Sequence, residues 1–156
     1  MRLHICAVGR MRAGPERALF DDYIARADRT GRALGLGPTS LHEVEDKKGG
    51  GPAAEAALLE RALPQGAVRI ALDERGKLTP SPKFAHQLAE WRDAGRGDLA
   101  FVIGGADGID AGLRATADFS LSFGAMVWPH MLARVMLAEQ IYRATTILAG
   151  GPYHRA

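Results

Sequence analysis

The last third of the chain contains three stretches whose residue types could build a binding or catalytic site. The first is an apolar run, Phe101–Ile103, that leads directly into the glycine-rich segment Gly104–Gly108. Glycine exposes backbone amides and lets a ligand approach closely. Open α/β sheets bind ligands at the carboxyl ends of their strands. The pattern predicts either a ligand loop or a plain tight turn, with Asp107 and Asp110 as possible caps of the next helix.

The second stretch, Phe123–Trp128, comes just before Pro129, a residue suited to the first turn of a helix. Its backbone groups could therefore receive a purine ring near the start of that helix. His130 follows the proline and has two interpretations, a structural histidine or a catalytic one. The charged segment Asp73–Lys77 is either a solvated turn or part of the same site, since it leaves the same sheet edge as Gly104 if the strands are parallel.

The third stretch is the tail, which ends on Tyr153, His154 and Arg155. Chain ends usually fray, so these side chains predict a docked tail that takes part in function. The preceding glycines leave open a tail that is mobile until substrate arrives. Glu139 and Arg143 stand four residues apart, a spacing that braces a helix.

Several classes of site are excluded by their missing patterns. No Cys or His pair has the spacing of metal ligands, so no metal is expected. The G-x-S-x-G motif of serine hydrolases is missing. The dinucleotide fingerprint and the P-loop lysine are also missing, which weakens the alternative of a Rossmann-type oxidoreductase.

The elements that position these stretches alternate between strand and helix. Strands are expected at Leu3–Val8, Ser40–Val44, Ala67–Leu72, Leu99–Ile103 and Phe119–Ser122. Helices are expected at Pro15–Leu34, from the glycine run Gly49–Gly51 to Pro64, and at Pro80–Ala94, Ala111–Ala115 and Pro129–Leu148. This order predicts an α/β fold, a mostly parallel sheet with helices on both faces. With 156 residues, one domain spanning 1–156 is expected.

The last helix has apolar residues around more of its circumference than one stripe. Core packing accounts for part of this width, and a two-fold partner would account for the rest. The residues concerned are Met131, Leu132, Val135, Met136, Ile141, Tyr142 and Ile147.

The amino-acid composition indicates which cellular compartment and which binding partners to expect. The single cysteine, Cys6, lies in an apolar run, which favours a reducing compartment and a core position. No segment approaches the ~20 apolar residues of a membrane span, so a soluble, cytoplasmic protein without a membrane partner is expected. The net charge of +2 is too mild to prove a nucleic-acid partner. The basic residues nevertheless cluster after the first strand and near the end of the chain.

An ordered set of motifs along nearly the whole chain resembles one family. It comprises Leu3-x-x-x-Ala7-Val8-Gly9, Leu72-Asp73 with Gly76-Lys77, Phe101–Gly105 with Gly108, Leu121-Ser122, Pro129-His130, Arg134, Glu139–Ala144 and Pro152-Tyr153-His154. These motifs resemble the RlmH-type methyltransferases, also called the YbeA family, of the SPOUT superfamily. The resemblance implies a SPOUT-type fold with a carboxyl-terminal trefoil knot, a rare exception to unthreaded chains.

The resemblance also implies an activity: methylation of N3 of a pseudouridine in large-subunit (23S) ribosomal RNA. The implied methyl donor is S-adenosylmethionine, the implied substrate is the assembled 70S ribosome, and the implied assembly is a homodimer with no DNA partner. Transferred onto this sequence, the cofactor contacts are Leu72, Gly104, Phe123, Gly124, Ala125, Met126, Val127 and Trp128. The chain departs from the family at Val127 and Trp128, where members commonly carry threonine and an aliphatic residue or phenylalanine.

Roles for the tail and the arginines follow from this chemistry as hypotheses. N3 of pseudouridine carries a proton that must be removed, and His154 is the first candidate for the general base. Arg155 would stabilise the anionic ring or hold a phosphate, and Tyr153 would stack on a base or orient it. The candidate RNA contacts are Arg10, Arg12, Arg17, Arg134 and Arg143. A noncatalytic ribosome-binding or assembly factor with the same fold is the alternative.

Overall fold

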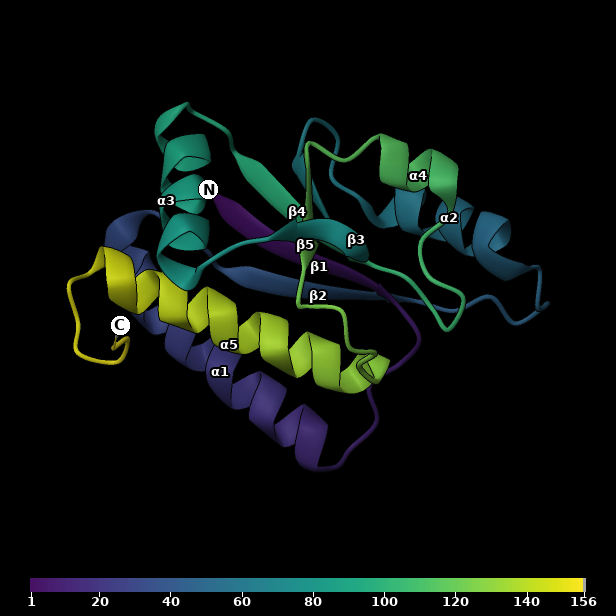
Figure 1. Cartoon of the computed structure of the whole chain (residues 1–156), viewed down its shortest axis with the longest axis horizontal. Helices are drawn as coiled ribbons and strands as arrows, with labels where there is room; N and C mark the ends of the chain where they lie inside the picture. The colour runs from purple at the N-terminus through teal and green to yellow at the C-terminus, as the bar shows by residue number, and fades with distance from the viewer. Residues whose placement is uncertain (156) are drawn as a thin grey trace.

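The computed structural model describes residues 1–155, in which strands and helices alternate (Figure 1). The strands are β1 (Arg2–Val8), β2 (Thr39–Val44), β3 (Val68–Leu78), β4 (Asp98–Ile103) and β5 (Phe119–Ser122). The helices are α1 (Pro15–Gly31), the 3-10 turn η1 (Arg32–Leu34), α2 (Gly51–Ala62), α3 (Ser81–Asp93), α4 (Ala111–Ala115) and α5 (His130–Leu148). Each predicted strand and helix is present.

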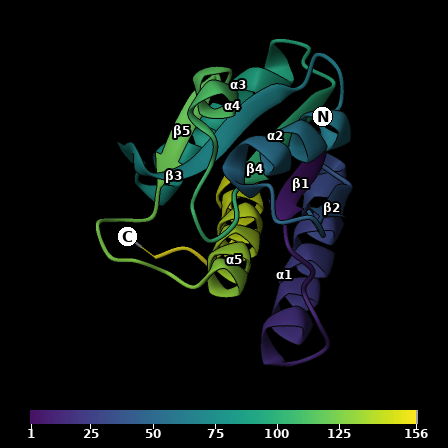
Figure 2. The same cartoon turned by 90° about the vertical axis from the view of Figure 1, so that its right-hand side faces the viewer.

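The strands form one parallel sheet in the order β2-β1-β4-β3-β5. β1 lies between β2 and β4, with Ile5 opposite Leu41 on one side and Phe101 on the other. Parallel neighbours need crossover connections, and these cover both faces of the sheet. Helices α1, α3 and α5 lie on one face, and α2 and α4 lie on the other (Figures 1 and 2). The predicted α/β class, with a parallel sheet between helices, is confirmed.

The two faces of β1 take part in two separate apolar layers. Leu3 and Ile5 are buried with Phe20 in the layer beneath α1, α3 and α5. Cys6 points the other way and is buried with Leu59 of α2. The division follows from the two-residue period of a strand. Burial raises the pKa of the Cys6 thiol to about 12, as expected for a core cysteine.

Helix α5 is the central helix of its face and packs against both α1 and α3. Its buried residues include Val135, Leu137 and Ile141. Much of the wide apolar surface predicted for this helix is therefore used inside the chain. Leu132, in the first turn, remains 37% exposed.

Helix α1 ends earlier than predicted, at Gly31 and not at Leu34. The chain folds back there, and the Leu36 amide donates a hydrogen bond of 3.0 Å to the Gly31 carbonyl. A side chain at Gly31 would collide with the Leu36 carbonyl. The glycine thus permits the turn that leads into β2.

Strand β3 is longer than predicted, and the segment after Leu72 is part of the sheet. Leu72 and Lys77 both pair with Leu121 of β5, so Asp73–Gly76 forms a bulge between them. Gly76 passes so close to β5 that a Cβ there would lie 2.7 Å from the Ser120 carbonyl. The charged segment is therefore not a turn that leaves the sheet, because Lys77 pairs with β5, but Glu74 and Arg75 on the bulge are exposed to solvent, as the solvated interpretation expects.

Among the described residues, no helix has both the length and the apolar character needed to cross a membrane.

Candidate active site

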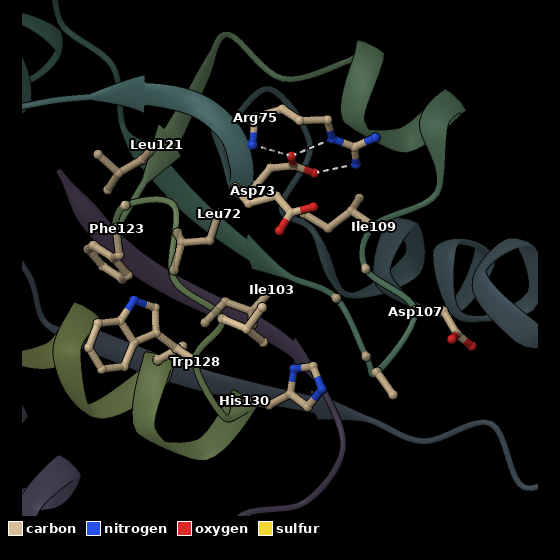
Figure 3. A pocket seen from close by; sticks show the side chains of 18 of the residues that line it. Leu72, Asp73, Arg75, Ile103, Asp107, Ile109, Leu121, Phe123, Trp128 and His130 are labelled. Atoms are coloured by element: carbon tan, nitrogen blue, oxygen red, sulfur yellow. Dashed lines mark hydrogen bonds and ion pairs between the residues drawn. The ribbon is translucent and has the colours of Figure 1, made fainter.

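The bulge of β3 and the carboxyl ends of β4 and β5 surround a cavity of about 450 Å³. This volume is typical of sites for small molecules. Figure 3 shows Leu72, Ile103 and Leu121 on its apolar side, Asp73 and Arg75 at one rim, and His130 at the opposite rim. Three loops that are distant in sequence therefore meet at one edge of the sheet.

The glycine-rich loop after β4 folds tightly onto itself. The Gly108 amide donates a hydrogen bond of 3.0 Å to the Gly105 carbonyl, and Gly108 has a positive φ of 82°. A Cβ at Gly104 would lie 2.5 Å from the Gly108 carbonyl. Only glycine fits at position 104, so the backbone itself forms this wall of the cavity. The Asp110 side chain caps α4 by accepting from the Gly112 and Leu113 amides, as predicted.

The bulge of β3 places a buried carboxylate at the rim. The Asp73 side chain is 4% exposed and accepts hydrogen bonds from Arg75 Nε at 2.8 Å and Nη2 at 2.9 Å. The Arg75 amide donates a third bond, and Arg114 Nη1 lies 3.6 Å away. The hydrogen bonds from the Arg75 side chain hold the pKa of Asp73 at about 2, against the opposing effect of burial. Asp73 is thus a fixed negative charge.

The loop after β5 is tied to that bulge by Ser122. Its hydroxyl donates to the Glu74 carbonyl at 3.1 Å and accepts from the Gly124 amide at 3.1 Å. Gly124 has a positive φ of 113°, which turns the chain toward α5. Ser122 therefore couples the positions of two cavity walls.

Of the eight predicted cofactor contacts, seven line this cavity, and Ala125 does not. The seven are Leu72, Gly104, Phe123, Gly124, Met126, Val127 and Trp128. Val127, which stands where family members carry threonine, is 88% exposed. Trp128 is 39% exposed. Cofactor contact by these residues stays a prediction.

His130 is the first residue of α5 and also lines the cavity. Sequence reasoning left its role open between structure and catalysis. Its position in the cavity lining makes it the one histidine that a single chain, over residues 1–155, contributes to this site.

The tail is docked on α5, as the large side chains at the end of the sequence predict. The Tyr153 hydroxyl donates to Glu139 Oε1 at 3.0 Å, and its ring lies 4.6 Å from that of Tyr142. The Arg143 guanidinium lies 4.8 Å from the centre of the Tyr153 ring, and its Nη1 is 3.2 Å from His154 Nδ1. Burial, followed by hydrogen bonding, raises the pKa of Tyr153.

The tail of one chain is remote from the cavity of the same chain. It contacts the second half of α5, whereas the cavity meets α5 at His130 and Ala133. At about 1.5 Å per residue, Arg143 lies about 20 Å along the helix from His130. Figure 1 shows the tail at the end of α5 opposite to the loop that begins the helix. Tyr153, His154 and Arg155 do not line the cavity.

Four of the five predicted RNA-contacting arginines fall into three environments. Arg10 and Arg12 are exposed in the loop after β1. Arg17 pairs with Asp21 at 3.1 Å. Arg143 forms the predicted ion pair with Glu139, with 3.0 Å between its Nε and Oε1, and is engaged in holding the tail.

The fifth predicted RNA contact, Arg134, has a completely buried side chain. Its Nη2 donates to the carbonyl oxygens of Val8 at 2.6 Å and Gly9 at 2.8 Å, and its Nη1 donates to Glu43 at 2.9 Å. An arginine enclosed in this way has no surface for a phosphate. Its prediction as an RNA contact was wrong.

Comparisons with known proteins agree with this architecture. A family model described as "Predicted SPOUT methyltransferase" matches residues 1–154. The chain belongs to the SPOUT methyltransferase family. The protein named ribosomal RNA large subunit methyltransferase H from Ruegeria sp. (strain TM1040) is 70% identical over 155 residues, with 99% of each chain covered. The protein of the same name from Ruegeria pomeroyi is 72% identical over the same length.

These relatives confirm the resemblance to RlmH-type proteins. Among solved structures, a probable methylase family protein from Haemophilus influenzae Rd KW20 matches 99% of this chain and 70% of its own, at 15% identity and a TM-score of 0.55. That likeness supports the fold alone. The trefoil knot implied by family membership stays a prediction.

Sequence reasoning left the segment Asp73–Lys77 open between a solvated turn and the site of this SPOUT methyltransferase, and Asp73 and Arg75 do line the cavity. It missed the third member of their cluster and the partners of Arg134. Arg114 gave no signal. The partners of Arg134 also gave none, since they belong to β1 and β2. Among residues 1–155, no group of His, Cys, Asp or Glu is arranged to hold a metal ion.

Proposed function

We propose that this SPOUT methyltransferase uses S-adenosylmethionine to methylate N3 of a pseudouridine in large-subunit ribosomal RNA, on the assembled 70S ribosome in the cytoplasm. The observation that carries the proposal is the cavity of about 450 Å³ in which seven predicted cofactor contacts converge. The names of the relatives support ribosomal RNA as the substrate. The finer assignment to pseudouridine N3 rests on the motif resemblance.

The lining fits the proposed cofactor in shape and chemistry. Leu72, Ile103 and Leu121 provide an apolar surface for a purine ring. Gly104 has no room for a side chain, so backbone polar groups border the ligand directly. Glu74 adds a carboxylate to the lining, which suits a cationic ligand. S-adenosylmethionine, when bound, supplies a methyl group activated by its positive sulfur.

The protein must then perform three tasks with its own residues. It must hold N3 of the nucleobase in line with the methyl carbon, exclude water and accept the imide proton. As the new carbon–nitrogen bond forms, the carbon–sulfur bond breaks and the proton passes to a base. The backbone loops around Gly104 and Gly124 serve the first two tasks.

Two histidines compete for the role of base. His154 is held by Arg143, outside the cavity of its own chain. His130 lines that cavity. If His154 acts, a second copy of the chain must supply it, which makes the predicted homodimer a requirement of catalysis. Tyr153 and Arg155 would reach the substrate with it.

The dimeric assignment has a direct test in mixed dimers. Gly104→Ala disables the cavity of one chain, and His154→Ala removes the base from the other. If the tail acts across the dimer, each mixed dimer of the two inactive variants has one complete site of two. Turnover is then about one half of wild type for pure mixed dimers and about one quarter after random mixing. Absence of recovery in verified mixed dimers, together with full loss in His130→Ala, would assign the base to His130.

The activity itself is tested by incubating the purified protein with labelled S-adenosylmethionine and 70S ribosomes that lack the modification. Mass spectrometry of the large-subunit RNA then locates the methyl group. We expect it on pseudouridine N3, with none transferred to ribosomes already modified. Ribosomes bearing unmodified uridine at that site reveal whether pseudouridine is required. Bound cofactor and bound ribosomes without transfer would favour the noncatalytic assembly factor.

A further inference from the structure

A smaller cavity, of about 240 Å³, lies beside the bulge of β3. Asp73, Arg75 and Gly76 border it on one side, and Arg114 and Ser120 border it on others. Asp73 and Arg75 also line the larger cavity. The two cavities therefore share a wall made of one carboxylate and one guanidinium.

The charges of this small cavity favour an anion. Two guanidiniums, Arg75 and Arg114, face the single carboxylate of Asp73, so the lining is net positive. Two further carboxylates, Glu74 and Asp107, line only the larger cavity, and Glu74 lies close enough to Arg75 to attract it electrostatically. Within the lining of the small cavity only Asp73 opposes the two cations, so this lining can accept a second negative group.

Asp73 also fixes the orientation of Arg75. Nε and Nη2 donate to Asp73, and Nη1 has no hydrogen-bond partner among residues 1–155. Figure 3 shows this third nitrogen directed away from the carboxylate. A planar guanidinium held on one edge and free on the other is suited to binding phosphate oxygens.

The exposure of the two arginines favours an anion carried by a polymer. The Arg75 side chain is 60% exposed and that of Arg114 is 28% exposed. A strand of RNA that delivers a base to the larger cavity would pass its backbone over the shared wall. The carboxylate of the cofactor's methionine is the other anion that could reach this wall, from inside the larger cavity.

We propose that Arg75 and Arg114, oriented by Asp73, form a seat for a phosphodiester of the substrate RNA, adjacent to the nucleotide that enters the larger cavity. The proposal rests on the function proposed above. It adds a binding site on the RNA path that lies apart from the arginines of the first loop.

The test measures ribosome binding and cofactor binding in the same variants. Arg75→Gln and Arg114→Gln remove one charge each, and Arg75→Lys and Arg114→Lys retain it. Arg61→Gln, an exposed arginine of α2, is the matched control. Thermal melting of every variant verifies that the fold is retained.

We expect each glutamine variant to weaken ribosome binding about tenfold and to lower the slope of log affinity against log salt by about 0.7 to 1. The lysine variants recover part of the affinity. Cofactor affinity stays within about twofold of wild type in Arg114→Gln, because Arg114 borders only the smaller cavity, and the Arg61→Gln control retains both affinities.

Two outcomes overturn the proposal. Unchanged ribosome affinity and salt slope in both glutamine variants would remove the phosphodiester seat, and selective loss of cofactor affinity would assign the arginines to the methionine carboxylate. Wild-type turnover on ribosomes is measured alongside. If the wild type transfers no methyl group, the proposed function fails. If the wild type transfers the methyl group and the glutamine variants bind ribosomes as the wild type does, the phosphate seat alone fails.

Discussion

Arg134 and Glu43 form an ion pair inside the protein, with 2.9 Å between Nη1 and Oε2, although 91 residues separate them. The same guanidinium bonds the carbonyl oxygens at the end of β1. Burial lowers the pKa of Arg134, and the bond to Glu43 opposes that shift. These contacts tie the beginning of α5 to the carboxyl ends of β1 and β2.

Replacing Arg134 should therefore cost stability before it affects RNA binding. Arg134→Met leaves the Glu43 carboxylate without its cationic partner, and we expect the free energy of unfolding to fall by about 3 to 5 kcal/mol. Urea denaturation measures the loss, with the exposed Arg29→Met as control. A loss below about 1 kcal/mol, accompanied by a smaller salt slope of ribosome binding, would restore Arg134 as an RNA contact.

Gly104→Ala should impair the larger cavity selectively. A Cβ there would lie 2.5 Å from the Gly108 carbonyl, so the loop must shift. We expect affinity for S-adenosylmethionine, measured by calorimetry, to fall at least about tenfold, equivalent to about 1.4 kcal/mol. Gly97→Ala is the matched control because nothing lies within 4 Å of its Cβ position. Equal affinities in the two variants would contradict cofactor binding at this loop.

Asp73 should contribute to stability in acid. Its pKa is held at about 2, below the ordinary value of 3.8, so the folded state favours the ionised form. The contribution is fully present above pH 3.8 and is lost as pH falls toward 2. We expect about 1 to 2 kcal/mol, seen as a less steep acid denaturation in Asp73→Asn. An unchanged acid profile in that variant would contradict the shielded ion pair.

Tyr153 should ionise at a higher pH than an exposed tyrosine, because burial and its hydrogen bonds disfavour the phenolate. The folded state then retains this proton longer than the unfolded state, so its contribution to stability is lost as pH rises above 10. Difference absorbance titration of wild type against Tyr153→Phe measures the shift. A tyrosine that titrates near pH 10 in the difference spectrum would indicate that the tail is not docked on α5 in solution.

Much of the site could be predicted because it depends on local sequence. Apolar runs that end in glycine or charge mark the carboxyl ends of strands, and parallel strands bring such ends to one edge. Gly104 and the loop Phe123–Trp128 were marked as candidate ligand loops in this way. The set of eight cofactor contacts came from the family resemblance, and seven of these residues line the cavity. The docked tail was likewise indicated by the large side chains at the end of the chain.

Local sequence was enough to predict the succession of strands and helices along the chain and the loops that could bear chemistry, because hydrophobic period and turn residues are local properties. Tertiary structure alone decided that β5 pairs with β3 beyond Leu72 and that Arg134 is enclosed by Glu43 and the end of β1. It also decided that Arg114 reaches Asp73 and that the tail lies far from its own cavity. Each of these depends on which distant segments meet, and burial changes the meaning of a charged residue without changing its spacing in the sequence.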